Sequence, residues 1–82
     1  MTEHEAARAW REQLGLTRER LSELTGYSTG SIQCMEAGFT SQRKPVAAGP
    51  WKRYKVACLC AAIMLATGEQ YSADNWTWHV AS

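Results

Sequence analysis

The sequence predicts an all-α fold: one small domain of four or five helices, followed by a short tryptophan-rich C-terminal tail. Helix-capping residues and glycine stops alternate at short intervals over residues 2–38, which predicts three short helices. Apolar side chains between these signals recur three or four residues apart, which is the helical period. A long apolar run over residues 56–66 predicts a fourth helix, and this run is about half the length that spans a bilayer.

The first helix is expected to begin near the amino terminus and to end at Gly15. Thr2, followed three residues later by Glu5, has the pattern of a capping box, which satisfies free backbone amides in the first helical turn. Apolar side chains recur every fourth residue on one face, at Ala6, Trp10 and Leu14. This spacing predicts an amphipathic helix.

Two short helices joined by a tight turn are expected next, over residues 18–25 and about 28–37. Thr17 and Ser28 are N-cap residues, because their hydroxyls can accept a free amide of the first turn. Gly26 and Gly38 are the matching stops, since glycine tolerates the positive φ common at helix ends. The inward residues are Leu21, Leu24, Ile32 and Met35. Helix, glycine turn and capped helix together form a helix-turn-helix pattern, whose second helix enters the DNA major groove.

Over residues 7–38 the sequence resembles the helix-turn-helix domain of the Cro/phage-repressor (XRE-type) transcriptional regulators. The positions that match the family pattern without a gap are Leu16, Thr17, Leu21, Gly26, Ser28, Ile32, Glu36 and Gly38. The departures from the pattern are Arg18 for glutamine, Ser22 for alanine, Thr25 for leucine, Tyr27 for valine and Met35 for an aliphatic residue. The resemblance implies a lambda-repressor-like domain over residues 1–68, with a recognition helix at about 28–37.

The resemblance also implies an ion pair between Arg11 and Glu36. In the family, an arginine at this position of the first helix pairs with the glutamate that Glu36 matches. Such a pair would tie the first helix to the end of the third and would be partly buried. Two solvated surface charges are the alternative, and an exposed pair of that kind contributes under about 1 kcal/mol.

The outward face of the third helix is expected to read bases. Its candidates are Thr29, Gly30, Gln33 and Cys34, with Ser31 alongside. Gln33 can pair with adenine through two hydrogen bonds, and Thr29 offers a hydroxyl or a methyl group. Gly30 costs up to about 1 kcal/mol in a helix relative to alanine, and its missing side chain would allow a close approach to DNA. A solvated face of a purely structural helix is the alternative.

Residues 39–49 are expected to form a basic loop, with Pro45 opposing regular pairing and with a functional or mobile role suggested by its length. In the resembling family this loop rests on the phosphate backbone. The phosphate-contact candidates, in this loop and elsewhere, are Arg18, Ser28, Ser31, Thr40, Ser41, Gln42, Arg43, Lys44, Lys52 and Arg53. Lys52 and Arg53 lie in the first turns of the fourth helix, where a docked phosphate would suit the helix dipole. Charge that only keeps the protein soluble is the alternative for these two residues.

The fourth helix is expected from Pro50 to Thr67, with Gly68 as its stop. After Lys55 it is apolar nearly all round, so one side needs a second cover besides the first three helices. That cover is either the C-terminal tail, residues 69–82, or another subunit. Residues 75–80 alternate like a short strand, so the tail is expected to be extended, with a partly disordered end as the alternative. The candidates for a dimer interface are Ile63, Met64, Trp76 and Trp78.

The charge distribution and the cysteine content limit the classes of function that the sequence can have. Residues 1–36 carry four basic and six acidic side chains, a net charge of −2, and residues 37–82 carry five basic and two acidic ones, a net charge of +3. The five basic residues lie between Arg43 and Lys55, a local patch that suits a polyanion. Three cysteines without paired spacing predict no disulfide framework and no metal site, and they suit a reducing cytoplasm. No signal peptide and no catalytic set of residues is visible, so no enzyme activity, cofactor, membrane or small-molecule ligand is expected.

These observations predict a sequence-specific transcriptional regulator that binds double-stranded operator DNA. A homodimer on a two-fold symmetric operator is expected, because such an operator mirrors the symmetry of the protein. The family resemblance implies a repressor or activator of phage or mobile-element type that controls nearby genes, including its own. The alternative is a protein-interaction module of helix-turn-helix fold, such as an antitoxin or anti-activator.

Overall fold

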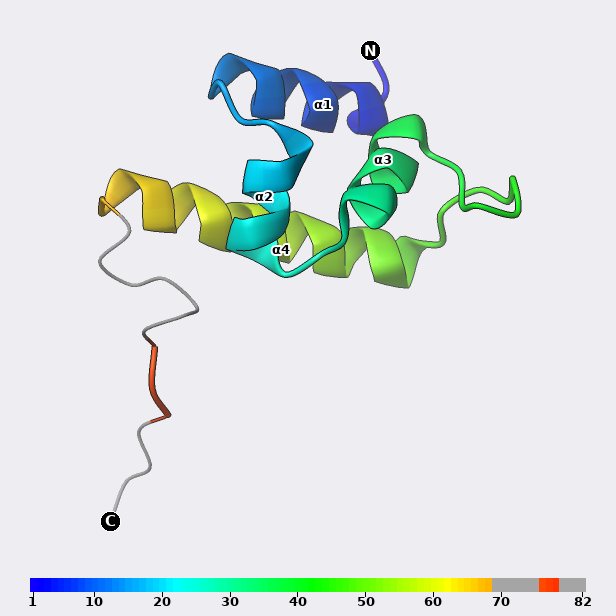
Figure 1. Cartoon of the computed structure of the whole chain (residues 1–82). Helices are drawn as coiled ribbons and strands as arrows, with labels where there is room; N and C mark the ends of the chain where they lie inside the picture. The colour runs from blue at the N-terminus through cyan, green and yellow to red at the C-terminus, as the bar shows by residue number, and fades with distance from the viewer. Residues whose placement is uncertain (69–75, 79–82) are drawn as a thin grey trace.

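The computed structural model describes residues 1–68 and 76–78 and is all-helical (Figure 1). Its four helices are α1 (Glu3–Gln13), α2 (Arg18–Thr25), α3 (Thr29–Ala37) and α4 (Ala48–Ala66). Within the described residues the only β-type pairing is an isolated antiparallel bridge between Phe39 and Pro45. The predicted fold class is therefore confirmed.

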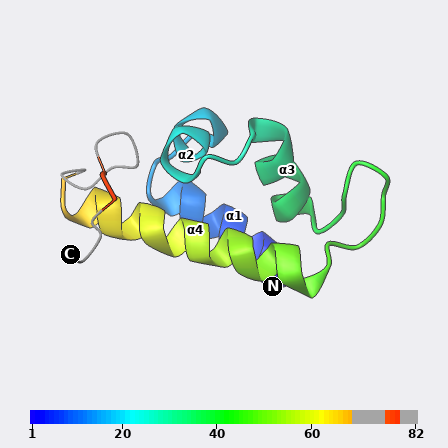
Figure 2. The ribbon, with the colours of Figure 1, turned by 90° about the horizontal axis from the view of Figure 1, so that it is seen from below.

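Helix α4 runs the length of the molecule, and the three shorter helices are arranged against it (Figures 1 and 2). The residues buried between them are Leu16, Leu21, Leu24, Ile32, Met35, Tyr54, Ala61 and Met64. Tyr54 is the largest fully buried side chain; it meets Tyr27 edge-on at 5.4 Å and stacks with Trp51 at 5.8 Å between ring centroids. This aromatic group fixes α4 beneath the turn between α2 and α3.

The predicted helix caps of α1, α2 and α3 are present. Thr2, Thr17 and Ser28 have extended backbone, and each side chain accepts a hydrogen bond from the amide three residues on. Gly26 and Gly38 end α2 and α3 with φ of 80° and 84°. A side chain at Gly38 would also crowd the His4 ring, which lies 3.1 Å from an added Cβ. Local capping chemistry therefore sets the boundaries of these helices.

The expected start of α4 at Pro50 is wrong, because the helix begins at Ala48. Proline is tolerated throughout the first turn, since its missing amide is one of four that have no intrahelical partner. Gly49, the residue before it, has no Cβ to clash with the proline ring. Ala47 is the N-cap and makes no side-chain hydrogen bond, so α4 begins without a polar cap.

The predicted apolar face of α1 is only partly buried, because Ala6 and Leu14 are exposed and Trp10 is half-buried. Met64 is buried in the protein's own core, so its assignment to a dimer interface is wrong, whereas Ile63 is exposed. Trp76 and Trp78 are exposed as well. The extended conformation expected for the tail falls mostly on residues 69–75 and 79–82, which lie outside the described residues.

The first turn of α1 is fastened to two other helices. Glu3 accepts hydrogen bonds from Trp51 Nε1 at 2.9 Å and Lys55 Nζ at 3.0 Å, and the Lys55 and Trp51 bonds lower the pKa of Glu3. His4 donates from Nδ1 to the Met35 carbonyl oxygen at 2.6 Å and lies against Trp51, with ring centroids 4.2 Å apart. These contacts hold α1, the end of α3 and the start of α4 together.

No helix among the described residues is both long and apolar enough to cross a membrane.

Candidate nucleic-acid interface

The turn between α2 and α3 is held by three local hydrogen bonds. The Gly26 amide donates to the Ser22 carbonyl oxygen at 2.9 Å, and the Thr25 hydroxyl donates to the Leu21 carbonyl oxygen at 2.8 Å. The Tyr27 amide then donates to Thr25 Oγ1 at 3.2 Å. Threonine at position 25, one of the departures from the family pattern, therefore contributes a hydrogen bond to the turn rather than an apolar contact.

Helix α3 divides cleanly into an inward and an outward face. Ile32, Met35 and Glu36 are buried, whereas Thr29, Gly30 and Gln33 are exposed and Cys34 is half-buried. The side chains of Thr29, Gln33 and Cys34 make no hydrogen bond to another described residue, and Gly30 has no side chain. The base-reading candidates are therefore free to contact an external ligand.

Gly30 lies in the first turn of α3 and has ordinary helical backbone there. A Cβ built at this position meets no atom within 4 Å, so neither space nor backbone conformation requires a glycine. Alanine would be more favourable in a helix by up to about 1 kcal/mol. The fold itself thus gives no reason for glycine at this exposed position.

The expected pair of Arg11 and Glu36 is present and buried. Arg11 Nε and Nη2 donate to the two Glu36 carboxylate oxygens at 2.6 and 3.2 Å, and Nη1 donates to the Leu16 carbonyl oxygen at 2.8 Å. The hydrogen bond to Glu36 raises the pKa of Arg11. This two-point contact ties α1 to the end of α3, as the resemblance implies.

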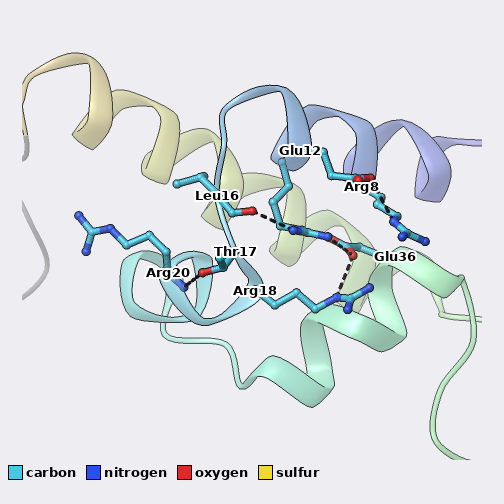
Figure 3. Close-up of polar contacts among 8 residues, drawn as sticks. Arg8, Glu12, Leu16, Thr17, Arg18, Arg20 and Glu36 are labelled. Atoms are coloured by element: carbon cyan, nitrogen blue, oxygen red, sulfur yellow. Dashed lines mark hydrogen bonds and ion pairs between the residues drawn. The ribbon is translucent and has the colours of Figure 1, made fainter.

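Arg18 joins the same carboxylate, which sequence reasoning missed. Its Nε lies 3.2 Å from Glu36 Oε1, and Figure 3 shows its side chain reaching from the start of α2 toward Glu36. The Glu36 side chain is 2% exposed, whereas that of Arg18 is 34% exposed. Two guanidinium groups therefore share one carboxylate, which leaves a net positive charge that is partly open to solvent. No sequence signal links the start of α2 to the end of α3, so only the folded structure brings these groups together.

The loop after α3 forms a hydrogen-bonded turn, and among the described residues Pro45 takes part only in the isolated bridge to Phe39, which agrees with the expectation that Pro45 opposes regular pairing. The Thr40 amide donates to the Lys44 carbonyl oxygen at 2.7 Å, and the Arg43 amide donates to the Thr40 carbonyl oxygen at 2.9 Å. Thr40 Oγ1 also accepts from the Gln42 and Lys44 amides at 3.3 and 3.2 Å. Arg43 adopts a positive φ of 61° at the turn. Proline fits at position 45 because an isolated bridge does not need its amide.

A broad concave surface of about 920 Å³ lies between α3, this loop and the start of α4. It gathers base-reading and phosphate candidates from both segments. Among its lining residues are Ser28, Gly30, Ser31, Gln33, Cys34, Thr40, Ser41 and Lys44. Thr29, Arg18, Gln42, Arg43, Lys52 and Arg53 lie outside this surface. Phe39, Val46 and Pro50 also line it and were not expected at the site.

Four exposed basic side chains lie in or next to the segments that form this surface. Within the described residues, Arg43, Lys44, Lys52 and Arg53 have no ion-pair partner. Lys55 differs from them, because it pairs with Glu3 at 3.0 Å. The loop and the start of α4 therefore present positive charge that no described carboxylate neutralises.

The described residues contain no group of three or more histidine, cysteine or acidic side chains that could hold a metal ion. Cys34, Cys58 and Cys60 are free thiols, and burial raises the pKa of Cys58. A raised thiol pKa lowers the fraction of reactive thiolate.

No family model matches the chain, and neither a curated protein nor a solved structure shows detectable similarity to it. The functional assignment therefore depends on the residues and geometry described above.

Proposed function

We propose that this protein is a sequence-specific DNA-binding transcriptional regulator that acts as a homodimer in the cytoplasm. In the proposed complex α3 enters the major groove and offers Thr29, Gly30, Gln33 and Cys34 to the base edges. The observation that carries the proposal is the concave surface beside α3, which combines Gly30, Gln33 and Cys34 with hydroxyl and ammonium donors of the loop.

The shape of this surface suits a helix in a DNA groove. A recognition helix in the major groove lies between two rows of backbone phosphates. Hydrogen-bond donors beside the helix contact these phosphates and fix the position of the helix. Thr40, Ser41 and Lys44 supply hydroxyl and ammonium donors there. Arg43, Lys52 and Arg53 add positive charge that lies outside the hollow and is unpaired within the described residues.

The first test is a titration of the full-length protein against DNA from upstream of its own gene, at low and high salt and with random competitor. Binding that survives competitor, with two protomers per site, is the expected result. Binding that disappears with competitor would leave only non-specific charge attraction and would contradict the proposal.

Matched substitutions separate the two kinds of contact. Arg43→Ala and Lys44→Ala should each weaken binding to all sequences and reduce the salt slope by about one. Gln33→Ala should relax base choice at one position, a discrimination of about 1–3 kcal/mol. Arg8→Ala is the control, because Arg8 is an exposed cation on α1 that pairs with Glu12. An equal loss for Arg8→Ala would contradict a specific role for the loop.

A protein-interaction module, such as an antitoxin or anti-activator, is the second candidate. It is favoured by the apolar side chains that α4 leaves exposed at Val56, Leu59 and Ile63. Exposed apolar patches of this kind mark protein-binding surfaces. Failure of the competitor titration would favour this second function.

A further inference from the structure

An open apolar groove of about 380 Å³ lies between α1 and α4. Small side chains and rings from both helices line it, among them Ala6, Ala7 and Trp10 of α1 and Cys58, Leu59 and Ala62 of α4. The ion pair of Glu3 and Lys55 also borders it. The groove therefore suits an apolar partner with a polar atom or two at the edge.

The apolar surface continues along α4. Leu59 is 60% exposed, and Val56 and Ile63, at helical spacing on either side of it, are exposed to a similar degree. From Val56 to Ala66 the helix carries no charged residue. A surface helix of a small protein ordinarily has a polar outer face, so this one is suited to burial against something else.

The chain itself carries a matching apolar group at its other end. Trp76 is 50% exposed and Trp78 is 84% exposed, and their rings meet edge-on with centroids 4.4 Å apart. Figure 1 shows residues 76–78 standing away from the four helices. Paired tryptophans are strong anchors for a protein contact because each buries a large area with few rotatable bonds.

We propose that the groove between α1 and α4 binds the Trp76–Trp78 segment of a second copy, and that the two copies exchange these segments reciprocally. Within one chain both tryptophans stay exposed and the groove stays open, so two apolar surfaces are left uncovered. Reciprocal exchange satisfies both at once with two-fold symmetry. Trp76 follows Gly68 by eight positions in the chain, so the segment between them extends at most about 28 Å.

This inference rests on the proposed function, since it names the contact that would hold the regulator's homodimer. It is tested without DNA, so its failure is distinguishable from failure of DNA binding. The contact is apolar apart from the Glu3–Lys55 edge, so added salt should leave dimerisation nearly unchanged, whereas it should weaken DNA binding steeply.

The experiment measures the oligomeric state of the full-length protein by sedimentation equilibrium, with two kinds of variant. Trp76→Ala with Trp78→Ala removes the anchor, and Leu59→Glu places a charge in the groove. Each should weaken dimerisation by about a hundredfold, as loss of anchor residues does at other interfaces. Leu14→Glu is the matched control, because Leu14 is an exposed leucine outside the groove. Circular dichroism checks that every variant keeps its helices.

Mixing the two variants gives the decisive measurement. The Leu59→Glu chain keeps an intact anchor and the double tryptophan variant keeps an intact groove, so together they can form one of the two contacts. We expect a heterodimer at a concentration where each variant alone is monomeric. A monomeric wild type, a dimer that survives loss of both tryptophans, or a mixture that stays monomeric would each overturn the proposal.

Discussion

At the scale of single residues, the glycine at position 30 is not required by the fold, so a contact with a ligand would explain it better. The fold leaves open space where a Cβ would lie, and the backbone at this position is ordinary helix. A glycine in this setting weakens the helix without relieving any contact in the protein. Close approach of a partner to the backbone of α3 would explain it.

Gly30→Ala should therefore raise the free energy of unfolding by up to about 1 kcal/mol and weaken DNA binding at the same time. Thermal melts and a DNA titration of the same preparation measure both effects. Unchanged affinity alongside the gain in stability would mean that α3 does not bring this residue close to DNA.

The stability of the fold depends on Glu36, because its buried carboxylate pairs with both Arg11 and Arg18. Glu36→Leu should lower the free energy of unfolding by about 3–5 kcal/mol, since it leaves the buried Arg11 guanidinium without a carboxylate. Arg11→Met should cost less, because Arg18 still partners the glutamate. Arg18→Met should cost under about 1 kcal/mol, because Arg18 is partly exposed.

Denaturant titrations of the three single variants and of the Arg11→Met, Glu36→Leu double variant measure these differences. The double variant should be more stable than the sum of its single effects implies, because removing both charges strands neither. Additive losses would show that the two groups do not stabilise the protein as a pair.

At the scale of elements, the loop between α3 and α4 is shaped in advance by Thr40. Its hydroxyl oxygen accepts two amides of the turn, and the turn positions Ser41 and Lys44 beside α3. A preshaped loop loses less conformational entropy when it binds.

Thr40→Val keeps the side-chain shape and removes the acceptor, so we expect faster amide hydrogen exchange at Gln42 and Lys44 and weaker DNA binding, with little change in the thermal melt. Ser41→Ala is the control for the exchange rates, because within the described residues the Ser41 hydroxyl makes no hydrogen bond. Unchanged exchange in Thr40→Val would mean that backbone bonds alone hold the turn.

Elements whose boundaries depend on local chemistry could be predicted from the sequence. Thr17, Ser28 and Gly26 act within one or two turns of chain, so the limits of α2 and α3 follow from residue type alone. The start of α4 could not be predicted in the same way, because nothing caps it and its proline is tolerated within the first turn.

Features that depend on long-range packing were not predictable. Arg18 meets Glu36 only because α2 and α3 fold together, and the Glu3 bonds to Trp51 and Lys55 join residues that lie 48 and 52 positions apart in the chain. The hollow beside α3 likewise needs the position of the loop, which depends on hydrogen bonds around Thr40 rather than on composition. The outward face of α3 was predictable because its inward residues repeat at helical spacing.

At the scale of the whole molecule, the buried Tyr54 makes the free energy of unfolding depend on pH in the alkaline range. Burial raises the pKa of Tyr54 above its usual value of 10.0 and that of Cys58 above 9.0. In the unfolded chain these groups lose their protons at the usual values, whereas the folded protein retains them. The unfolded state then binds fewer protons, so stability falls as pH rises.

We expect full stability below about pH 9 and a progressive loss above it. Tyr54→Phe should reduce the part of this loss that occurs above about pH 10, whatever its effect at neutral pH. Urea midpoints measured for both proteins across this range test the expectation. Parallel pH profiles of wild type and Tyr54→Phe would contradict it.

The division of α3 into two faces has a consequence for how this protein could change over evolution. Ile32, Met35 and Glu36 hold the fold, whereas Thr29, Gly30, Gln33 and Cys34 make no side-chain hydrogen bond to another described residue. Substitutions at the second set should therefore keep the fold and change only the outward surface of α3, one position at a time. The outward face of α3 is therefore a suitable starting point for selecting new binding properties from a library of outward-face variants.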